Sequence, residues 1–208
     1  MSLETGRRII RSKAVWGGAI RAVLALSLFA FSGCGDLVRE GTGSAYLIVK
    51  SIEAASGAEP NDFGGNLLSD VVTNVDGAPT YFNDLARTTF TLQMKDILTS
   101  PTPNNFITLT RYHVEFIRAD GRNTQGVDVP YAFDGGITAT VNAADTAVSV
   151  TIVRNQAKLE APLANLSRNL VILSTIARIT FYGHDQTGRE ASATAQISVD
   201  FANFGDPG

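Results

Sequence analysis

Near its end the chain reads Ala177-Arg-Ile-Thr-Phe-Tyr-Gly-His-Asp-Gln-Thr-Gly-Arg-Glu-Ala-Ser-Ala-Thr-Ala-Gln-Ile-Ser-Val199. Apolar or small residues alternate with polar ones on both sides of Asp185-Gln-Thr-Gly188, a run of turn residues. An alternation with a period of two places apolar side chains on one face of a strand and polar ones on the other. The segment therefore predicts a β-hairpin with one buried face and one face in water.

The same alternation recurs upstream in three further segments. Its apolar members are Phe90, Leu92 and Met94; Tyr112, Val114 and Phe116; and Val148, Val150 and Ile152. Strands are also predicted at 45–52, 129–133 and 137–141, the last two separated by Asp134-Gly135-Gly136, with a short helical turn at 161–167. About seven strands without a sustained helical period predict an all-β fold, an antiparallel β-sandwich.

Residues 54–86 lack any such period. They contain turn-forming runs at 57–66 and at Asp76-Gly-Ala-Pro79, and we expect a long excursion with one short strand at 71–75. Loops of this length within a compact domain are often functional or mobile. This segment and the edge strands are therefore the surfaces where a protein partner is expected.

Residues 177–199 resemble the closing strand pair of bacterial immunoglobulin-like domains. That family ends in an alternating strand, an Asp-x-x-Gly turn and an alternating strand rich in Ala and Thr. The resemblance implies an immunoglobulin-like β-sandwich over 45–208. The chain has a single cysteine, so the paired cysteines of antibody domains are missing and no intramolecular disulfide forms.

The N-terminal region has the layout of an export signal. Its basic residues are Arg7, Arg8, Arg11, Lys13 and Arg21, opposed only by Glu4. The apolar run at 22–31 follows. As a helix this run would reach about 15 Å, half of the roughly 30 Å hydrocarbon layer of a membrane. The pattern therefore predicts a cleavable signal rather than a permanent span.

Phe31-Ser32-Gly33-Cys34 resembles the lipobox of bacterial lipoproteins. The resemblance implies a lipid on Cys34, cleavage that removes 1–33, a tether at 34–44 and a domain at 45–208. It also implies a cell-envelope protein that is lipid-anchored to a membrane, with its body in the periplasm or on the cell surface. The alternative is an ordinary cleaved signal, because Ala30-Phe31-Ser32 is also a small-x-small site.

Charge argues against nucleic acid as a partner. Removing residues 1–33 takes away five of 17 basic and one of 20 acidic residues, which leaves 12 and 19 and a formal charge of −7. Binding to phosphates requires a basic surface, and an acidic body of this kind does not provide one.

Catalytic motifs are missing from the sequence. It has no Gly-x-Ser-x-Gly elbow, no phosphate-binding Gly-rich loop with Lys, no His-Glu-x-x-His and no Cys-x-x-Cys. His113 falls on the polar side of its strand. His184 adjoins Asp185, a pair that could orient a base or bind a metal, but strand neighbours point to opposite faces and turn chemistry is the simpler interpretation. We expect no enzyme, no catalytic residue and no cofactor.

Two further groups of residues suggest ligands. Oxygen ligands for Ca²⁺ could come from Glu59, Asn61, Asp62 and Asn66, or from Asp70, Asp76 and Asp84, although such residues also dominate ordinary turns. A sugar- or protein-binding face could use the aromatic residues Phe63, Tyr81, Phe82 and Tyr131, for which core or loop packing is the simpler interpretation.

Together these patterns predict a membrane-tethered envelope lipoprotein whose β-sandwich is a non-enzymatic binding or structural module. The alternative is a carbohydrate-active β-sandwich, either a hydrolase or a sugar-binding accessory, marked by a cleft with two carboxylates about 5–9.5 Å apart. A calcium-dependent adhesin is a third possibility.

Overall fold

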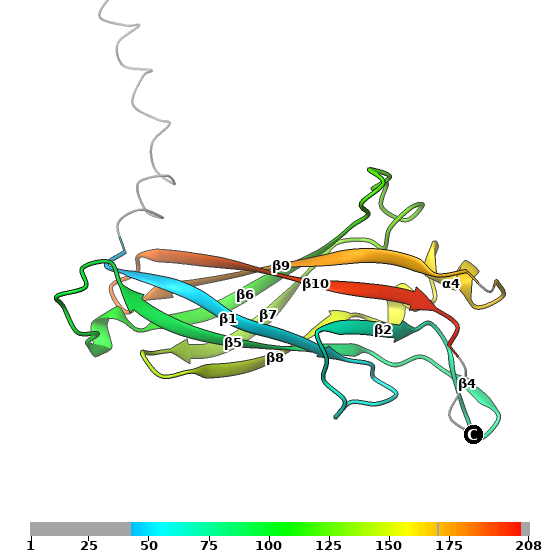
Figure 1. Cartoon of the computed structure of the whole chain (residues 1–208), viewed down its shortest axis with the longest axis horizontal. Coiled ribbons are helices and arrows are strands. Elements are labelled where there is room, and N and C mark those ends of the chain that lie inside the picture. The colour runs from blue at the N-terminus through cyan, green and yellow to red at the C-terminus, as the bar shows by residue number, and fades with distance from the viewer. Residues whose placement is uncertain (1–42, 170, 205–208) are drawn as a thin grey trace, which may run out of the picture. The chain divides into compact units, whose positions relative to one another are not determined.

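A computed structural model describes residues 43–169 and 171–204, and these residues form an all-β structure (Figure 1). The smaller of the two main sheets has the order β1-β5-β8, built from β1 (Ala45–Ala55), β5 (Asp84–Met94) and β8 (Thr146–Val153). The larger has the order β2-β10-β9-β6-β7, built from β2 (Asn66–Asp70), β10 (Glu190–Ala202), β9 (Leu173–Asp185), β6 (Ile107–Ile117) and β7 (Phe133–Val141). β3 (Thr73–Val75) and β4 (Ala78–Thr80) form a separate hairpin, and the short helices are η1 (Pro103–Asn105), α3 (Asn155–Lys158) and α4 (Leu163–Leu166).

The two main sheets share one hydrophobic core, as in a β-sandwich. Phe90 of β5 meets Phe181 of β9 edge to face, with ring centroids 4.8 Å apart, so side chains of both sheets are in contact. Phe116 and Phe201 form a second edge-to-face pair within the larger sheet, at 5.5 Å. None of the helices in 43–169 or 171–204 combines the length and the apolar character needed to cross a membrane.

The predicted hairpin is confirmed as β9 and β10. Phe181 pairs with Ala193 and Ile179 with Ala195. Ile179, Phe181 and Val199 are completely buried, while their polar neighbours face outward. The turn is closed by Asp185, whose Oδ1 accepts hydrogen bonds from the Thr187 N–H (2.9 Å), the Thr187 hydroxyl (2.7 Å) and the Arg189 N–H (3.0 Å).

Asp185 should make the fold sensitive to acid. Burial alone would raise the pKa of its carboxyl, but the hydrogen bonds from Thr187 and Arg189 lower it below the ordinary value. Because the pKa is lower in the folded chain than in the unfolded one, the carboxylate stabilises the fold above about pH 4, and this contribution is lost as pH falls further. We expect Asp185→Asn to lower the free energy of unfolding by about 1 kcal/mol at pH 7 and to weaken its decline between pH 5 and 3, measured by urea denaturation. An equally steep decline in the variant would contradict this role.

The short strand expected at 71–75 is present as β3, but the interpretation of the rest of 54–86 as an excursion without strands is wrong. The segment contains β2, β3 and β4, and β2 runs parallel to β10, with Leu67 opposite Val199, in a sheet whose other pairs are antiparallel. Leu67 and Ser69 are buried while Asn66 and Leu68 are exposed, so only two inward side chains mark this strand. The described chain therefore has ten strands, eight of them in the two main sheets, rather than about seven.

The predicted break at Asp134-Gly135-Gly136 is also wrong, because β7 runs through it and pairs with β6. A Cβ on Gly135 would lie 2.2 Å from Cζ of Tyr112, so the glycine makes room for that ring within the strand. Val129 forms only an isolated bridge with Gln125, and the strand predicted at 129–133 is absent except for Phe133, where β7 begins. The helical turn expected at 161–167 is confirmed as α4.

Candidate functional site

The outer face of the larger sheet, the one turned away from the core, is polar. Because side chains alternate along each strand, the outward residues of three neighbouring strands share this face. They are Arg111, His113 and Glu115 of β6; Arg178, Thr180, Tyr182 and His184 of β9; and Ser192, Thr194 and Gln196 of β10. We call this set the outer face, and it carries both histidines of the chain.

Arg111 lies at the centre of the contacts on the outer face. Its guanidinium donates to Oδ1 of Asp134 on β7 at 2.7 Å and lies 4.0 Å from the centroid of the Tyr182 ring. The pairing of β6 with β9 shifts register between Leu109 and Arg111, so the side chains of Thr110 and Arg111 are both exposed to solvent. Arg111 then lies opposite Tyr182 of β9. The arginine is thus held between a carboxylate and a ring.

Asp134 also holds His113, whose Nδ1 lies 3.3 Å from the same Oδ1. The hydrogen bond from Arg111, opposed in part by desolvation and aided by His113, lowers the pKa of the Asp134 carboxyl. Asp134 therefore stays ionised at neutral pH. Its charge fixes the positions of two potential ligand-binding side chains.

Beside Arg111 the outer face is hollowed by a cavity of about 330 Å³. Its lining includes Arg111, Tyr182, His184, Glu190 and Ser192. Binding cavities typically have volumes of about 300–1,000 Å³ and a few convergent polar groups. This one offers a cation, a carboxylate, a hydroxyl and a ring, a set suited to a polar ligand.

The two histidines lie apart on the outer face. His113 lies opposite Thr180, whereas His184 lies opposite Thr108, further along the same pair of strands. His184 is exposed and Asp185 buried, which confirms that the two neighbours face opposite ways and that Asp185 serves the turn. His113 instead contacts Asp134, a partner that its own strand does not reveal.

Of the two possible sets of calcium ligands, the one made of Asp70, Asp76 and Asp84 is not brought together. Asp70 accepts hydrogen bonds from the Thr73 hydroxyl (2.8 Å) and the Phe204 N–H (3.1 Å), Asp76 occupies the β3–β4 turn with φ +53°, and Asp84 is buried. Over 43–169 and 171–204, no three His, Cys, Asp or Glu residues come together in a metal-binding group.

Three of the residues that could form an aromatic binding face, Phe63, Tyr81 and Tyr131, have different surroundings. The Phe63 ring lies beside the smaller sheet, where its centroid is 4.2 Å from the guanidinium of Arg87 on β5. Tyr131 is half exposed and packs against Gly126, where a Cβ would lie 2.3 Å from the Tyr131 hydroxyl. Tyr81 lines a separate hollow of about 400 Å³ near α3 and α4. The aromatic side chain that lines the cavity beside Arg111 is Tyr182, which the sequence did not single out.

Asp84 forms an ion pair in the core. Its Oδ1 accepts a hydrogen bond from Nζ of Lys158 at 2.9 Å, and both side chains are almost completely buried (exposed fractions 0% and 1%). The Ser69 hydroxyl donates to Oδ2 at 2.6 Å and the Gly57 N–H to Oδ1 at 2.9 Å. Burial raises the pKa of the Asp84 carboxyl against the opposing effect of these three donors. The cluster joins β5 to β2, to the loop before β2 and to α3.

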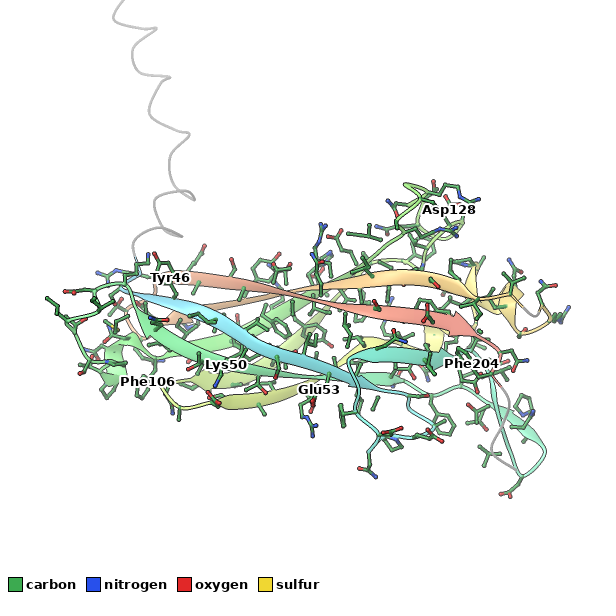
Figure 2. All side chains as sticks on the ribbon, in the orientation of Figure 1. Tyr46, Lys50, Glu53, Phe106, Asp128 and Phe204 are labelled. Carbon is green, nitrogen blue, oxygen red and sulfur yellow. The ribbon has the colours of Figure 1, made fainter. Side chains whose placement is uncertain are left out.

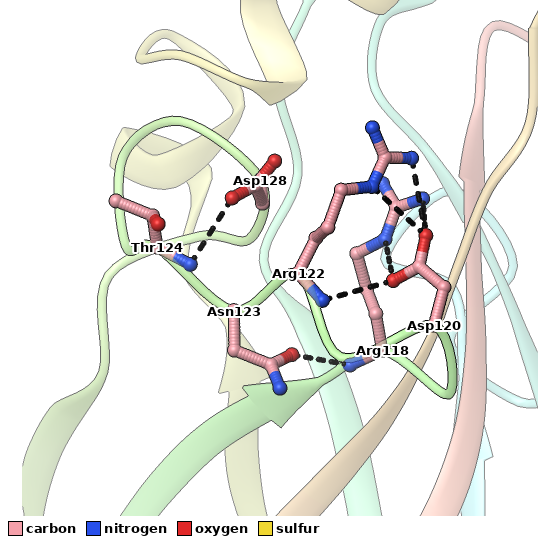
Figure 3. A network of polar contacts seen from close by, with 6 residues as sticks. All are labelled: Arg118, Asp120, Arg122, Asn123, Thr124 and Asp128. Carbon is pink, nitrogen blue, oxygen red and sulfur yellow. Dashed lines mark hydrogen bonds and ion pairs between the residues drawn. The ribbon is translucent and has the colours of Figure 1, made fainter.

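A second polar network orders the loop between β6 and β7. Figure 3 shows the Asp120 carboxylate bonded to the guanidinium groups of both Arg118 and Arg122. The Arg118 N–H donates to Oδ1 of Asn123 at 2.7 Å. The hydrogen bond from Arg118, followed by the one from the Arg122 N–H, lowers the pKa of the Asp120 carboxyl. The loop thus projects from the sheets as an ordered element rather than an open chain (Figure 1).

These features define a two-sheet all-β protein with a polar, hollowed sheet face. In comparisons with known proteins, the chain matches no family model, no curated protein and no solved structure. The expected lipid site Cys34 and the signal at 1–33 lie outside the residues that the structure describes.

Proposed function

We propose that the protein is a cell-envelope lipoprotein, tethered to a membrane through Cys34, whose β-sandwich is a non-enzymatic binding module. The export-signal layout and the lipobox resemblance at 31–34 support the tether. Several acyl chains on one residue, each CH₂ adding about 0.8 kcal/mol, give stable membrane attachment. The β-sandwich then binds its partner at the surface of the membrane that holds Cys34.

Strand order supports an immunoglobulin-like sandwich. In such domains the first, second and fifth strands share one sheet, and the third, sixth and seventh share the other. Here β1, β5 and β8 form one sheet, while β6, β9 and β10 are neighbours in the other, extended by β7. β2 continues from β1 and crosses to the edge of the larger sheet, where it pairs with β10.

The outer face is the binding surface of this proposal. The single observation that carries it is the Arg111 arrangement, in which Asp134 and Tyr182 fix a cation beside a hollow of about 330 Å³. A preorganised, exposed cation and ring reduce the entropy lost when a partner binds. Arginine and tyrosine are also among the residues most enriched at binding hot spots.

Replacing Cys34 tests the tether. Cys34→Ser removes the only thiol of the chain, so we expect the protein to move from the membrane fraction to the soluble fraction of fractionated cells, detected by immunoblot. If the Cys34→Ser protein is cleaved of residues 1–33 and still remains in the membrane fraction to the same extent as wild type, the tether is contradicted.

Replacing Arg111 tests the binding face. We expect Arg111→Ala to reduce by at least tenfold the amount of partner captured with the tagged, lipidated protein from its native envelope, since a hot-spot residue contributes about 2 kcal/mol or more. The chain offers a matched control in Arg87, which pairs with Glu53 at 2.7 Å and stacks over Phe63, but on the smaller sheet. An equal loss in Arg87→Ala, or no loss in Arg111→Ala, would contradict the assignment.

The carbohydrate-active alternative is favoured only in its sugar-binding form. Tyr182 beside hydroxyl and charged groups suits the stacking of a sugar ring. The hollow beside Arg111 contains Glu190 as its one carboxylate, and the hollow near α3 and α4 contains none. A third hollow of about 320 Å³, beside Ile176 of β9, contains Asp200 as its one carboxylate. None of these three holds the carboxylate pair of a hydrolase. A rise in melting temperature with added oligosaccharide, lost in Tyr182→Ala, would support this alternative.

A further inference from the structure

The loop between β5 and η1 exposes two neighbouring aliphatic side chains. Ile97 and Leu98 have exposed fractions of 85% and 90%, the highest among the exposed large hydrophobic residues of the described chain. Their backbone is held in a turn, in which Oδ1 of Asp96 accepts from the Leu98 N–H at 3.0 Å and the Asp96 carbonyl accepts from the Thr99 N–H at 3.1 Å. The turn therefore presents the two side chains to solvent in a fixed arrangement instead of letting them fold back.

This loop lies where the N-terminal chain enters the sandwich. The Ser44 carbonyl accepts from the Lys95 N–H at 2.9 Å, and the Ser44 hydroxyl accepts from the Asn105 amide at 2.7 Å, so both ends of the loop are bonded to the residue before β1. Figure 2 shows Tyr46 and Phe106 at this end, and Asp128 toward the other. We call Tyr46, Lys95, Ile97 and Leu98 the entry-end cluster.

The cluster has the composition of a membrane-surface contact. Nζ of Lys95 lies 5.1 Å from the centroid of the Tyr46 ring, which is half exposed. Tyrosine is enriched at the level of the lipid headgroups, and lysine keeps its ammonium group there while its methylene chain lies along apolar surface. Aliphatic side chains beyond them would enter the acyl boundary.

We infer that Ile97 and Leu98 insert into the headgroup region of the membrane to which Cys34 is attached. The sandwich is then held at its entry end in a fixed orientation instead of rotating freely on its tether. This inference rests on the proposed lipid anchor. Ser44 lies ten positions beyond Cys34, and extended backbone spans at most about 3.6 Å per residue, so Ser44 stays within about 36 Å of the anchor. The loop bonded to Ser44 is therefore close to the membrane as well. Such a tether gives even a weak contact a high effective concentration.

Charge specifies the kind of membrane surface. The body carries a formal charge of −7 beyond residue 33, and Asp96 lies inside the turn, so anionic lipids offer no attraction. Insertion is driven by apolar contact, and a neutral phosphatidylcholine bilayer suffices.

Single-cysteine labelling tests the inference, because a lipidated Cys34 leaves the chain without a free thiol. Full-length Leu98→Cys is purified from membranes, labelled with an environment-sensitive fluorophore and reconstituted in phosphatidylcholine vesicles. We expect a blue shift of the emission and loss of quenching by aqueous iodide. The matched control is Val127→Cys, an aliphatic position exposed to 68% on the β6–β7 loop, whose label should stay in water.

Three results would overturn the inference, and they are distinguishable. If the protein sediments with vesicles but the label at 98 is as accessible to iodide as that at 127, the anchor stands and the inserted loop does not. If wild-type protein itself takes up label and stays in the supernatant, Cys34 carries no lipid, and the anchor and the inference fail together. If the label at 98 is shielded without vesicles, increasingly with protein concentration, the loop mediates contact between copies instead.

Discussion

Lys158→Met should lower the free energy of unfolding by about 3–5 kcal/mol, because it leaves the Asp84 carboxylate buried without its countercharge. The methionine fills nearly the same volume, so the loss reports the charge rather than a cavity. Ser69 and Gly57 still donate to Asp84, but neither supplies a positive charge. Urea denaturation of the purified protein at pH 7 measures the difference.

Two comparisons separate this electrostatic effect from general disruption. Adding Asp84→Asn to Lys158→Met removes the buried charge and keeps an acceptor for the Gly57 N–H, so the double variant should be more stable than Lys158→Met alone. Burial raises the pKa of Asp84 above its unfolded value, so the folded form of Lys158→Met is favoured when the carboxyl is protonated. Its deficit should therefore shrink as pH falls from 7 toward 4. A deficit that is independent of pH and unchanged in the double variant would contradict the buried pair.

Phe181→Ala should cost a similar amount, about 3–5 kcal/mol, since it empties a completely buried site between the sheets. Phe181 contacts Phe90 across the sandwich edge to face and lies 6.3 Å from the Tyr112 ring, so truncation removes contacts in both sheets.

The neighbouring residue is the control for Phe181. Tyr182→Ala on the outer face should cost only about 1 kcal/mol, the loss of a surface stacking contact with Arg111. The contrast between two adjacent aromatic residues tests the alternation of faces along β9. Equal losses in the two variants, measured by urea denaturation, would contradict the assignment of inner and outer faces.

The sequence pattern was sufficient where a strand has many alternating residues. β9 and β10 each have 13 residues, and their alternation defined the hairpin, its turn and its buried face. The order of the strands in the two sheets could not be predicted from the sequence pattern. β2 has only Leu67 and Ser69 facing inward, and Gly135 looked like a break because the Tyr112 ring that fills its place lies on another strand.

The candidate site could be predicted only one strand at a time. Alternation from Ile179 and Phe181 puts Tyr182 and His184 on the polar side of β9, but nothing local indicates that β6 and its Arg111 lie beside them. Asp84 and Lys158 are 74 positions apart, and a lysine in a short helix normally predicts solvent exposure. Such pairings exist only once the chain has folded, so spacing in the sequence does not reveal them.

The tether at Cys34 is the central claim, since it sets the location of the protein and the orientation of its sandwich. Mass spectrometry of the N-terminal peptide of the mature protein, isolated from its native membrane, tests the claim most directly. We predict a chain that begins at Cys34 and carries the added mass of several acyl chains on that residue. An N-terminus at another residue, or a Cys34 of unmodified mass, would contradict it.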